Sequence, residues 1–150
     1  MKIGHRIAGA SKLAALVGVS LTLAAGPVYA ESRSTTSKIT TNWDAFFAGS
    51  TGANRKIALV QDGSSFAKVI KSQATSPIAK SVTAKVSKVV VDSKSTATVR
   101  YSLNLGGKPA LTNQKGEAVL QGGTWKVGAQ SFCSLLALEQ VKLPICSKAS

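Results

Sequence analysis

The stretch ATVRYSLNL, residues 97–105, decides the fold class of this chain. Its odd-numbered positions are all apolar, whereas Thr98, Arg100 and Ser102 occupy even-numbered ones. Successive side chains of a β-strand point to opposite faces of the sheet. The alternation therefore predicts an antiparallel strand with one buried face and one face in solvent.

The segment just before it, residues 82–91, predicts the neighbouring strand, and residues 92–95 predict the turn between the two. The apolar positions of this segment change phase near Ser87 and Lys88. A change of phase by one residue indicates a β-bulge, which bends the strand. We therefore expect a curved sheet.

A second hairpin is predicted at Gly122-Gly123, because both central positions of a type I′ turn require positive φ. This turn places Leu120 opposite Trp125 on one face of the hairpin. Residues 106–116 (GGKPALTNQKG), which precede it, predict a long irregular loop.

Helical spacing precedes the strands. Trp43, Phe46 and Phe47 fall on one helical face, and the pattern predicts a helix that begins near Thr41 and ends at Gly49. Further helices are expected before the first strand, and a short apolar helix is expected after the last one. This order predicts an α+β domain in which helices pack on one face of a curved antiparallel sheet that forms a cone.

The first thirty residues have the order of a secretory signal peptide: a basic start, an apolar run over residues 13–25, and small residues before an expected cut between Ala30 and Glu31. The apolar run is shorter than the roughly 20 residues that span a bilayer, and an uncleaved membrane anchor is the alternative. Residues 31–41 are rich in Ser and Thr and predict a flexible tether. Residues 42–150 then form a single domain.

The amino-acid composition argues against most common classes of enzyme. The only histidine, His5, lies in the predicted signal peptide, so the mature chain has no Ser-His-Asp or Cys-His arrangement. It also lacks the commonest metal ligand, and no cofactor-binding motif is present. We expect a protein without catalytic residues, metal or cofactor. Cys133 and Cys146, the only cysteines, predict one structural disulfide in an oxidising compartment.

The chain is strongly basic, with 19 Lys and Arg residues against six Asp and Glu. Three of the basic residues and none of the acidic ones precede Glu31, which leaves a formal charge of +10 on the mature part. Such a charge favours anionic partners, although the lysines are scattered and also fit a solvated surface. No element for reading nucleic-acid bases is visible, so we expect no nucleic-acid partner.

Three stretches together resemble a known family: NWDAFFAGST (residues 42–51), KIALVQDGSSF (56–66) and LGGKPALTNQKGEAVLQGGTWKVGAQSFCSLLAL (105–138). They are similar to the mycobacterial low-molecular-weight secreted antigens, a family of actinobacterial exported proteins. The resemblance implies a cystatin-like or nuclear-transport-factor-two-like cone, in which helices sit in the hollow of a curved sheet. It carries no catalytic motif.

Three functions remain open. The first is a secreted protein, free or associated with the cell wall, that binds a small apolar or amphipathic ligand in the cone. Its candidate lining residues are Phe46, Phe47, Tyr101, Leu103 and Trp125, which fit a plain hydrophobic core equally well. The second function is electrostatic association with anionic envelope polymers or lipids. The third, a cone-fold enzyme, would use Tyr101 as a proton donor and Asp44 or Asp62 as a base. The sequence leaves the oligomeric state open.

Overall fold

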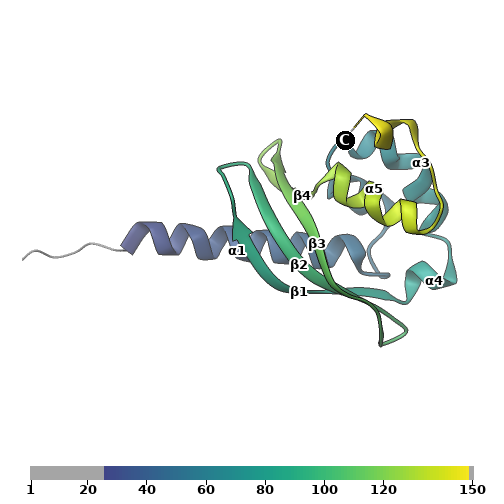
Figure 1. Cartoon of the computed structure of the whole chain (residues 1–150), viewed down its shortest axis with the longest axis horizontal. Coiled ribbons are helices and arrows are strands. Elements are labelled where there is room, and N and C mark those ends of the chain that lie inside the picture. Colours follow the sequence, from purple (N-terminus) through teal and green to yellow (C-terminus); the bar gives the residue numbers. More distant parts are fainter. Residues whose placement is uncertain (1–25, 149–150) are drawn as a thin grey trace, which may run out of the picture.

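The computed structural model describes residues 26–148, and their side chains from Ser32 onward. Its sheet is antiparallel and has four strands in sequence order, and it curls into a half-barrel (Figure 1). Helix α1 (Gly26–Phe47) runs along the hollow of the sheet and contacts both edge strands. The strands are β1 (Val82–Val91), β2 (Thr96–Leu105), β3 (Lys108–Gln121) and β4 (Thr124–Val127).

The shorter helices gather at one end of the sheet, as Figure 1 shows for α3, α4 and α5. This arrangement confirms the predicted α+β class, with helices packed in a curved antiparallel sheet. These helices are α2 (Ala53–Ala58), α3 (Gly63–Gln73), α4 (Pro77–Lys80), α5 (Ala129–Leu138) and the 3₁₀ turn η1 (Pro144–Ser147).

The predicted first hairpin is confirmed. Ala97, Val99 and Tyr101 of β2 are at most 2% exposed, whereas Arg100 between them is exposed. The pairing of β1 with β2 shifts by one residue between Val86 and Lys88, which is the bulge that the phase change predicted. The sheet therefore bends where the sequence indicated.

The second hairpin is also confirmed, with Leu120 opposite Trp125 and positive φ at both Gly122 and Gly123. The prediction of a long loop over residues 106–116 is wrong, because most of this segment lies in β3. Gly106 and Gly107 also have positive φ, 57° and 77°, and make a tight turn, so that β3 begins at Lys108. The connection between β2 and β3 is therefore a two-glycine turn, and most of the segment that was predicted as a loop belongs to β3.

The predicted start of the first helix near Thr41 is wrong as well, because α1 begins at Gly26. Residues 31–41, predicted to form a flexible tether, are helical. Ile39, which lies one turn before Trp43, is only 1% exposed. One buried residue on the correct helical face thus anchors a stretch whose composition suggests a linker.

The predicted signal peptide, residues 1–30, lies mostly outside the described residues. Only its last five residues are described, as the first part of α1. Among the helices that the structure describes, none combines the length and the apolar character needed to cross a bilayer.

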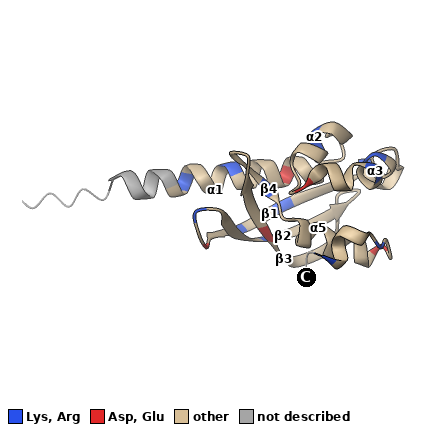
Figure 2. Ribbon diagram, turned by 90° about the horizontal axis from the view of Figure 1, so that it is seen from above, with Lys and Arg blue, Asp and Glu red and all other residues tan. Residues whose placement is uncertain are grey.

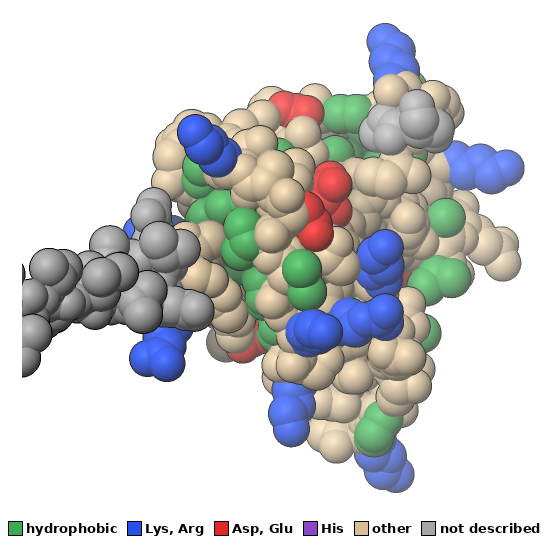
Figure 3. Space-filling view, turned by 60° about the vertical axis from the view of Figure 1, so that its left-hand side comes forward, with side chains coloured by type: hydrophobic (Ala, Val, Ile, Leu, Met, Phe, Trp, Pro, Cys, Tyr) green, Lys and Arg blue, Asp and Glu red, His purple; other side chains and the backbone are tan. Residues whose placement is uncertain are grey.

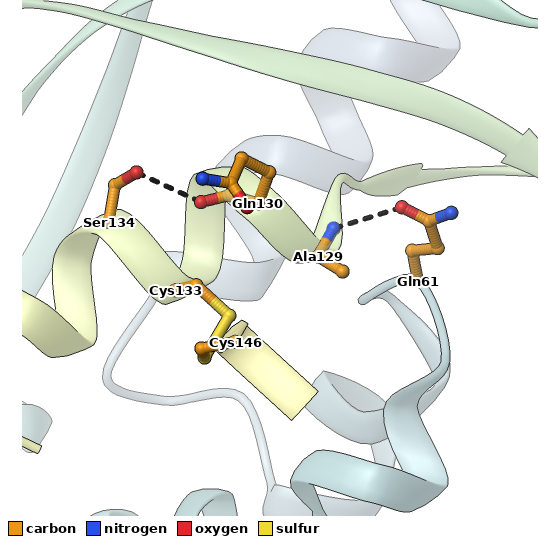
Figure 4. The surroundings of a disulfide bond; sticks show 6 residues. All are labelled: Gln61, Ala129, Gln130, Cys133, Ser134 and Cys146. Carbon is orange, nitrogen blue, oxygen red and sulfur yellow. Dashed lines mark hydrogen bonds between the residues drawn. A yellow bond between two sulfur atoms is a disulfide. The ribbon is translucent and has the colours of Figure 1, made fainter. Parts of the chain in front are cut away.

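An aromatic cluster forms the centre of the core. Phe46 packs edge-on against Phe132 of α5, with ring centroids 5.3 Å apart, and Phe132 packs in turn against Phe66 of α3. The predicted disulfide is confirmed: Cys133 of α5 is bonded to Cys146 of η1 (Figure 4). The bond fixes the C-terminal segment against the aromatic cluster.

Candidate functional site

An apolar cavity of about 510 Å³ lies at the helical end of the sheet. Helix α1 stops at Phe47, and strand residues near its end, such as Leu103 of β2, face the space that no helix fills. Helices α3, α4 and α5 close its other sides. Most lining residues are apolar: Phe46, Phe47, Ile70, Ala74, Ile78, Ala79, Val82, Leu103, Leu111, Phe132, Leu135, Leu136 and Leu138.

The rim of this cavity exposes large apolar side chains. Ile78 of α4 is 65% exposed and Leu138 of α5 is 63% exposed, and both belong to the lining. A soluble surface exposes scattered apolar residues without consequence. Here, however, the two residues border one apolar hollow, and a concave apolar site with few polar groups is typical of small-molecule binding.

Four polar side chains also line the cavity: Lys56 of α2, Gln73 of α3, Ser76 and Glu139. The amide Nε2 of Gln73 donates a hydrogen bond to the carboxylate Oε2 of Glu139. Burial lowers the pKa of Lys56 from its ordinary value of 10.5, because water no longer solvates its ammonium group fully.

The structure divides the five candidate lining residues. Phe46, Phe47 and Leu103 line the cavity. Tyr101 lies two residues before Leu103 on the same face of β2. Its ring stacks on that of Phe47, with centroids 5.6 Å apart, and packs against that of Trp43, with centroids 5.1 Å apart. It is therefore covered by α1 and is 2% exposed.

Trp125 lies elsewhere. Its backbone carbonyl accepts a hydrogen bond of 2.9 Å from Asn42 Nδ2 of α1. Trp125 belongs to the lining of a smaller hollow of about 310 Å³ between α1 and the β3–β4 turn, and it is absent from the lining of the apolar cavity.

Sequence reasoning missed the α3–α4 and α5 sides of the cavity. Leu135 and Leu138 belong to the apolar run after Ser131, which the sequence shows plainly. This run has more apolar residues than one face of a helix can bury against the sheet. The surplus apolar residues could have indicated that part of this helix lines a cavity. Nothing in the sequence singles out Lys56.

The residues considered for catalysis do not line the cavity. One carboxylate oxygen of Asp44 is buried and has no hydrogen-bond partner among the described residues. Burial raises the pKa of Asp44, and a backbone hydrogen bond with Val86 partly opposes that rise. Burial likewise raises the pKa of Tyr101 to about 12. Asp62 is exposed and accepts a hydrogen bond of 2.8 Å from Gln121 Nε2.

Metal ligands are not grouped in this structure. Within residues 26–148, no set of three or more His, Cys, Asp and Glu side chains is placed to hold a metal ion.

Basic residues are distributed over most elements (Figure 2), and several gather on the face seen in Figure 3. On the outer face of the sheet they form a cross-strand row, because Lys88 pairs with Arg100 and Arg100 pairs with Lys115. All three are exposed. We call Lys88, Arg100 and Lys115 the cationic row.

Comparison with known proteins places the chain in a family. No curated protein matches it. A family model, described as the C-terminal domain of the low molecular weight antigen MTB12, matches residues 32–142. That range includes residues 32–41 of α1, which belong to the predicted tether, together with all four strands and α5. The chain belongs to the family of the MTB12 low molecular weight antigen C-terminal domain.

Proposed function

We propose that this protein is an exported, non-catalytic binding protein that holds a small apolar or amphipathic ligand in the cavity between the sheet end and helices α3, α4 and α5. The observation that carries the proposal is the apolar rim. Ile78 and Leu138, both more than 60% exposed, border a hollow of about 510 Å³. This volume lies within the roughly 300–1,000 Å³ typical of small-molecule sites.

The physical basis of binding is the removal of apolar surface from water. A ligand in the cavity covers the exposed faces of Ile78 and Leu138 together with its own apolar surface, and each Å² of apolar surface removed from water stabilises the complex by about 25 cal/mol. The cavity is shaped by α5, which the Cys133–Cys146 bond ties to the C-terminal segment. The site is therefore largely formed before the ligand arrives, which reduces the cost of ordering it.

Export is supported by two independent features. The N-terminal order of basic, apolar and small residues is typical of a signal peptide. A disulfide between the only two cysteines fits an oxidising compartment outside the cytoplasm. Binding outside the cell, or at its wall, is the setting we propose.

The proposal is tested by titration with N-phenyl-1-naphthylamine, a neutral apolar dye whose fluorescence rises in apolar surroundings. We expect saturable binding at one site per chain. Ala74 lines the cavity, so Ala74→Trp fills part of it and is expected to weaken binding about tenfold, which corresponds to about 1.4 kcal/mol.

Ala137→Trp is the matched control for this titration. Ala137 is an exposed residue of α5 that does not line the cavity, so the control adds the same indole without filling the site. We expect its affinity to equal that of the unchanged protein. Equal affinities for all three proteins, or a fluorescence rise that never saturates, would contradict the proposal.

A second function, association with an anionic envelope polymer, is favoured by the cationic row. Like charges directly opposite each other on neighbouring strands destabilise a sheet, and the row keeps three of them together. The contact that the structure gives the Arg100 side chain carries no opposite charge: Arg100 Nη1 donates to the neutral amide oxygen of Asn113, at 3.4 Å. A polyanion lying across the strands would compensate these charges.

This second function predicts salt-sensitive binding to polygalacturonate, a carboxylate polymer. Replacing Lys88, Arg100 and Lys115 together by glutamine is expected to weaken binding at least tenfold at low salt, because attraction between exposed charges is screened within about 10 Å at 0.1 M salt. The control replaces three other exposed lysines, Lys68, Lys71 and Lys142. Equal loss in both variants would show that net charge alone acts, and that the row is not a site.

A further inference from the structure

The apolar cavity has two charged lining residues, which differ in how far they are buried. Among the described residues of its lining, Lys56 of α2 is the one basic residue, and Glu139, which follows α5, is the one acidic residue. Lys56 is half-buried, whereas Glu139 is exposed at the rim. The cavity thus combines an apolar interior with one partly buried positive charge.

Among the residues that the structure describes, none places a carboxylate where it raises the pKa of Lys56. Loss of solvation is the only cause that lowers its pKa; a neighbouring carboxylate would raise it instead. A charged group that is partly removed from water and unpaired is unfavourable. An anion placed beside Lys56 would therefore gain an interaction that the empty protein does not satisfy.

Glu139, the acidic residue of the lining, has a different partner in the structure. Its Oε2 accepts a hydrogen bond from the side-chain amide of Gln73, and both residues lie at the α3 and α5 side of the cavity. The hydrogen bond holds the one negative charge of the lining at the exposed rim.

We propose that the natural ligand class is a single-chain amphiphile with an anionic head, which binds with its head beside Lys56 and its chain against Phe46, Leu103 and Leu135. The inference rests on the proposed function, since it names the ligand class of the same cavity. A single apolar chain matches a lining in which most residues are apolar and few are polar. The head matches the only positive charge in that lining.

The test is competition against bound N-phenyl-1-naphthylamine by three 12-carbon amphiphiles: dodecanoate, dodecyl phosphate and neutral 1-dodecanol. Both anionic competitors are expected to bind at least tenfold more tightly than dodecanol, because hydrogen bonds to a charged group are the stronger ones. A difference between dodecanoate and dodecyl phosphate then distinguishes a fatty acid from a phosphate-headed lipid.

Substitutions of Lys56 test whether this residue causes the preference for anionic competitors. Lys56→Gln is expected to weaken both anionic competitors at least tenfold more than it weakens dodecanol, so that the preference for the anionic head is lost. Saturable binding of the dye by this variant shows that it is folded. Lys56→Arg is expected to keep the preference. Lys68→Gln, an exposed change on α3 outside the lining, is the charge-matched control and is expected to behave like the unchanged protein.

The outcomes separate the two proposals. If dodecanol and dodecanoate displace the dye equally well from both the unchanged protein and Lys56→Gln, the head-group inference is overturned and the binding function stands. If the dye itself does not bind saturably, the binding function fails, and the head-group inference fails with it. An equal loss of anion preference in Lys68→Gln would also overturn the role of Lys56.

Discussion

Trp43→Ala is expected to lower the free energy of unfolding by about 3–5 kcal/mol, the usual cost of truncating a buried tryptophan. Trp43 is 1% exposed and packs against both Phe47 and Tyr101, with its ring centroid 5.1 Å from that of Tyr101. It therefore joins α1 to the middle of the sheet. Total stabilities of small domains are about 5–15 kcal/mol, so this single change removes a large part of it.

The same tryptophan requires glycine on the facing strand. A Cβ atom at Gly116 of β3 would lie 2.8 Å from Cη2 and 2.9 Å from Cζ2 of Trp43. Gly116→Ala alone is expected to cost about 1–3 kcal/mol through overpacking. In a Trp43→Phe background the two clashing atoms are absent, so the same substitution is expected to cost clearly less.

Chemical denaturation of the four proteins in this double-mutant cycle measures the coupling between the two sites. Trp43→Phe tests packing alone, because the buried indole Nε1 of Trp43 donates to no residue in the described part of the chain. Ile78→Ala, at a residue that is 65% exposed, serves as the control with a small effect. Costs that simply add would show that Trp43 does not press on Gly116.

Removal of the disulfide, by the double change Cys133→Ala and Cys146→Ala, is expected to cost about 3 kcal/mol. The bond joins residues 13 positions apart, and in the chain-entropy model a closed loop of this length restricts the unfolded chain by about that amount. The enclosed segment also brings Val141 and Leu143 against the core. Without the bond, this segment and α5 lose their shared anchor.

The measurement is the denaturation midpoint with and without a thiol reductant. The midpoint of the unchanged protein is expected to fall in reductant to that of the double variant, whereas the double variant itself is expected not to respond. We also expect the variant to bind N-phenyl-1-naphthylamine less tightly, because α5 lines the cavity. A midpoint of the unchanged protein that ignores complete reduction would contradict a stabilising role for the bond.

The sheet was predictable because its signals are local. Alternation over residues 97–105 and the phase change near Ser87 act within one strand or one hairpin. The start of α1 was not predictable in this way. Thr and Ser residues before Thr41 suggest a linker, and only the tertiary position of Ile39 in the core stabilises a helix there. The weak helix propensity of these Ser and Thr residues is outweighed by the burial of Ile39 in the core.

The cavity was only half predictable for a related reason. Alternation indicates which face of β2 is buried, but it does not indicate how far along the strand the covering helix extends. Tyr101 and Leu103 share that face, yet α1 covers Tyr101 and ends before it can cover Leu103. Lys56 could not be found from the sequence, because its role depends on how α2 lies against helices that are distant along the chain.

The most direct test of ligand binding in the cavity is a methyl NMR titration with N-phenyl-1-naphthylamine. We expect the methyl signals of Ile70, Leu103 and Leu111, which line the cavity, to shift along one saturating curve. Val90 and Val91 of β1, which are 43% and 40% exposed but lie outside the lining, are expected not to shift. Shifts that are as large at Val90 and Val91 as at Leu103, or that never saturate, would contradict the account.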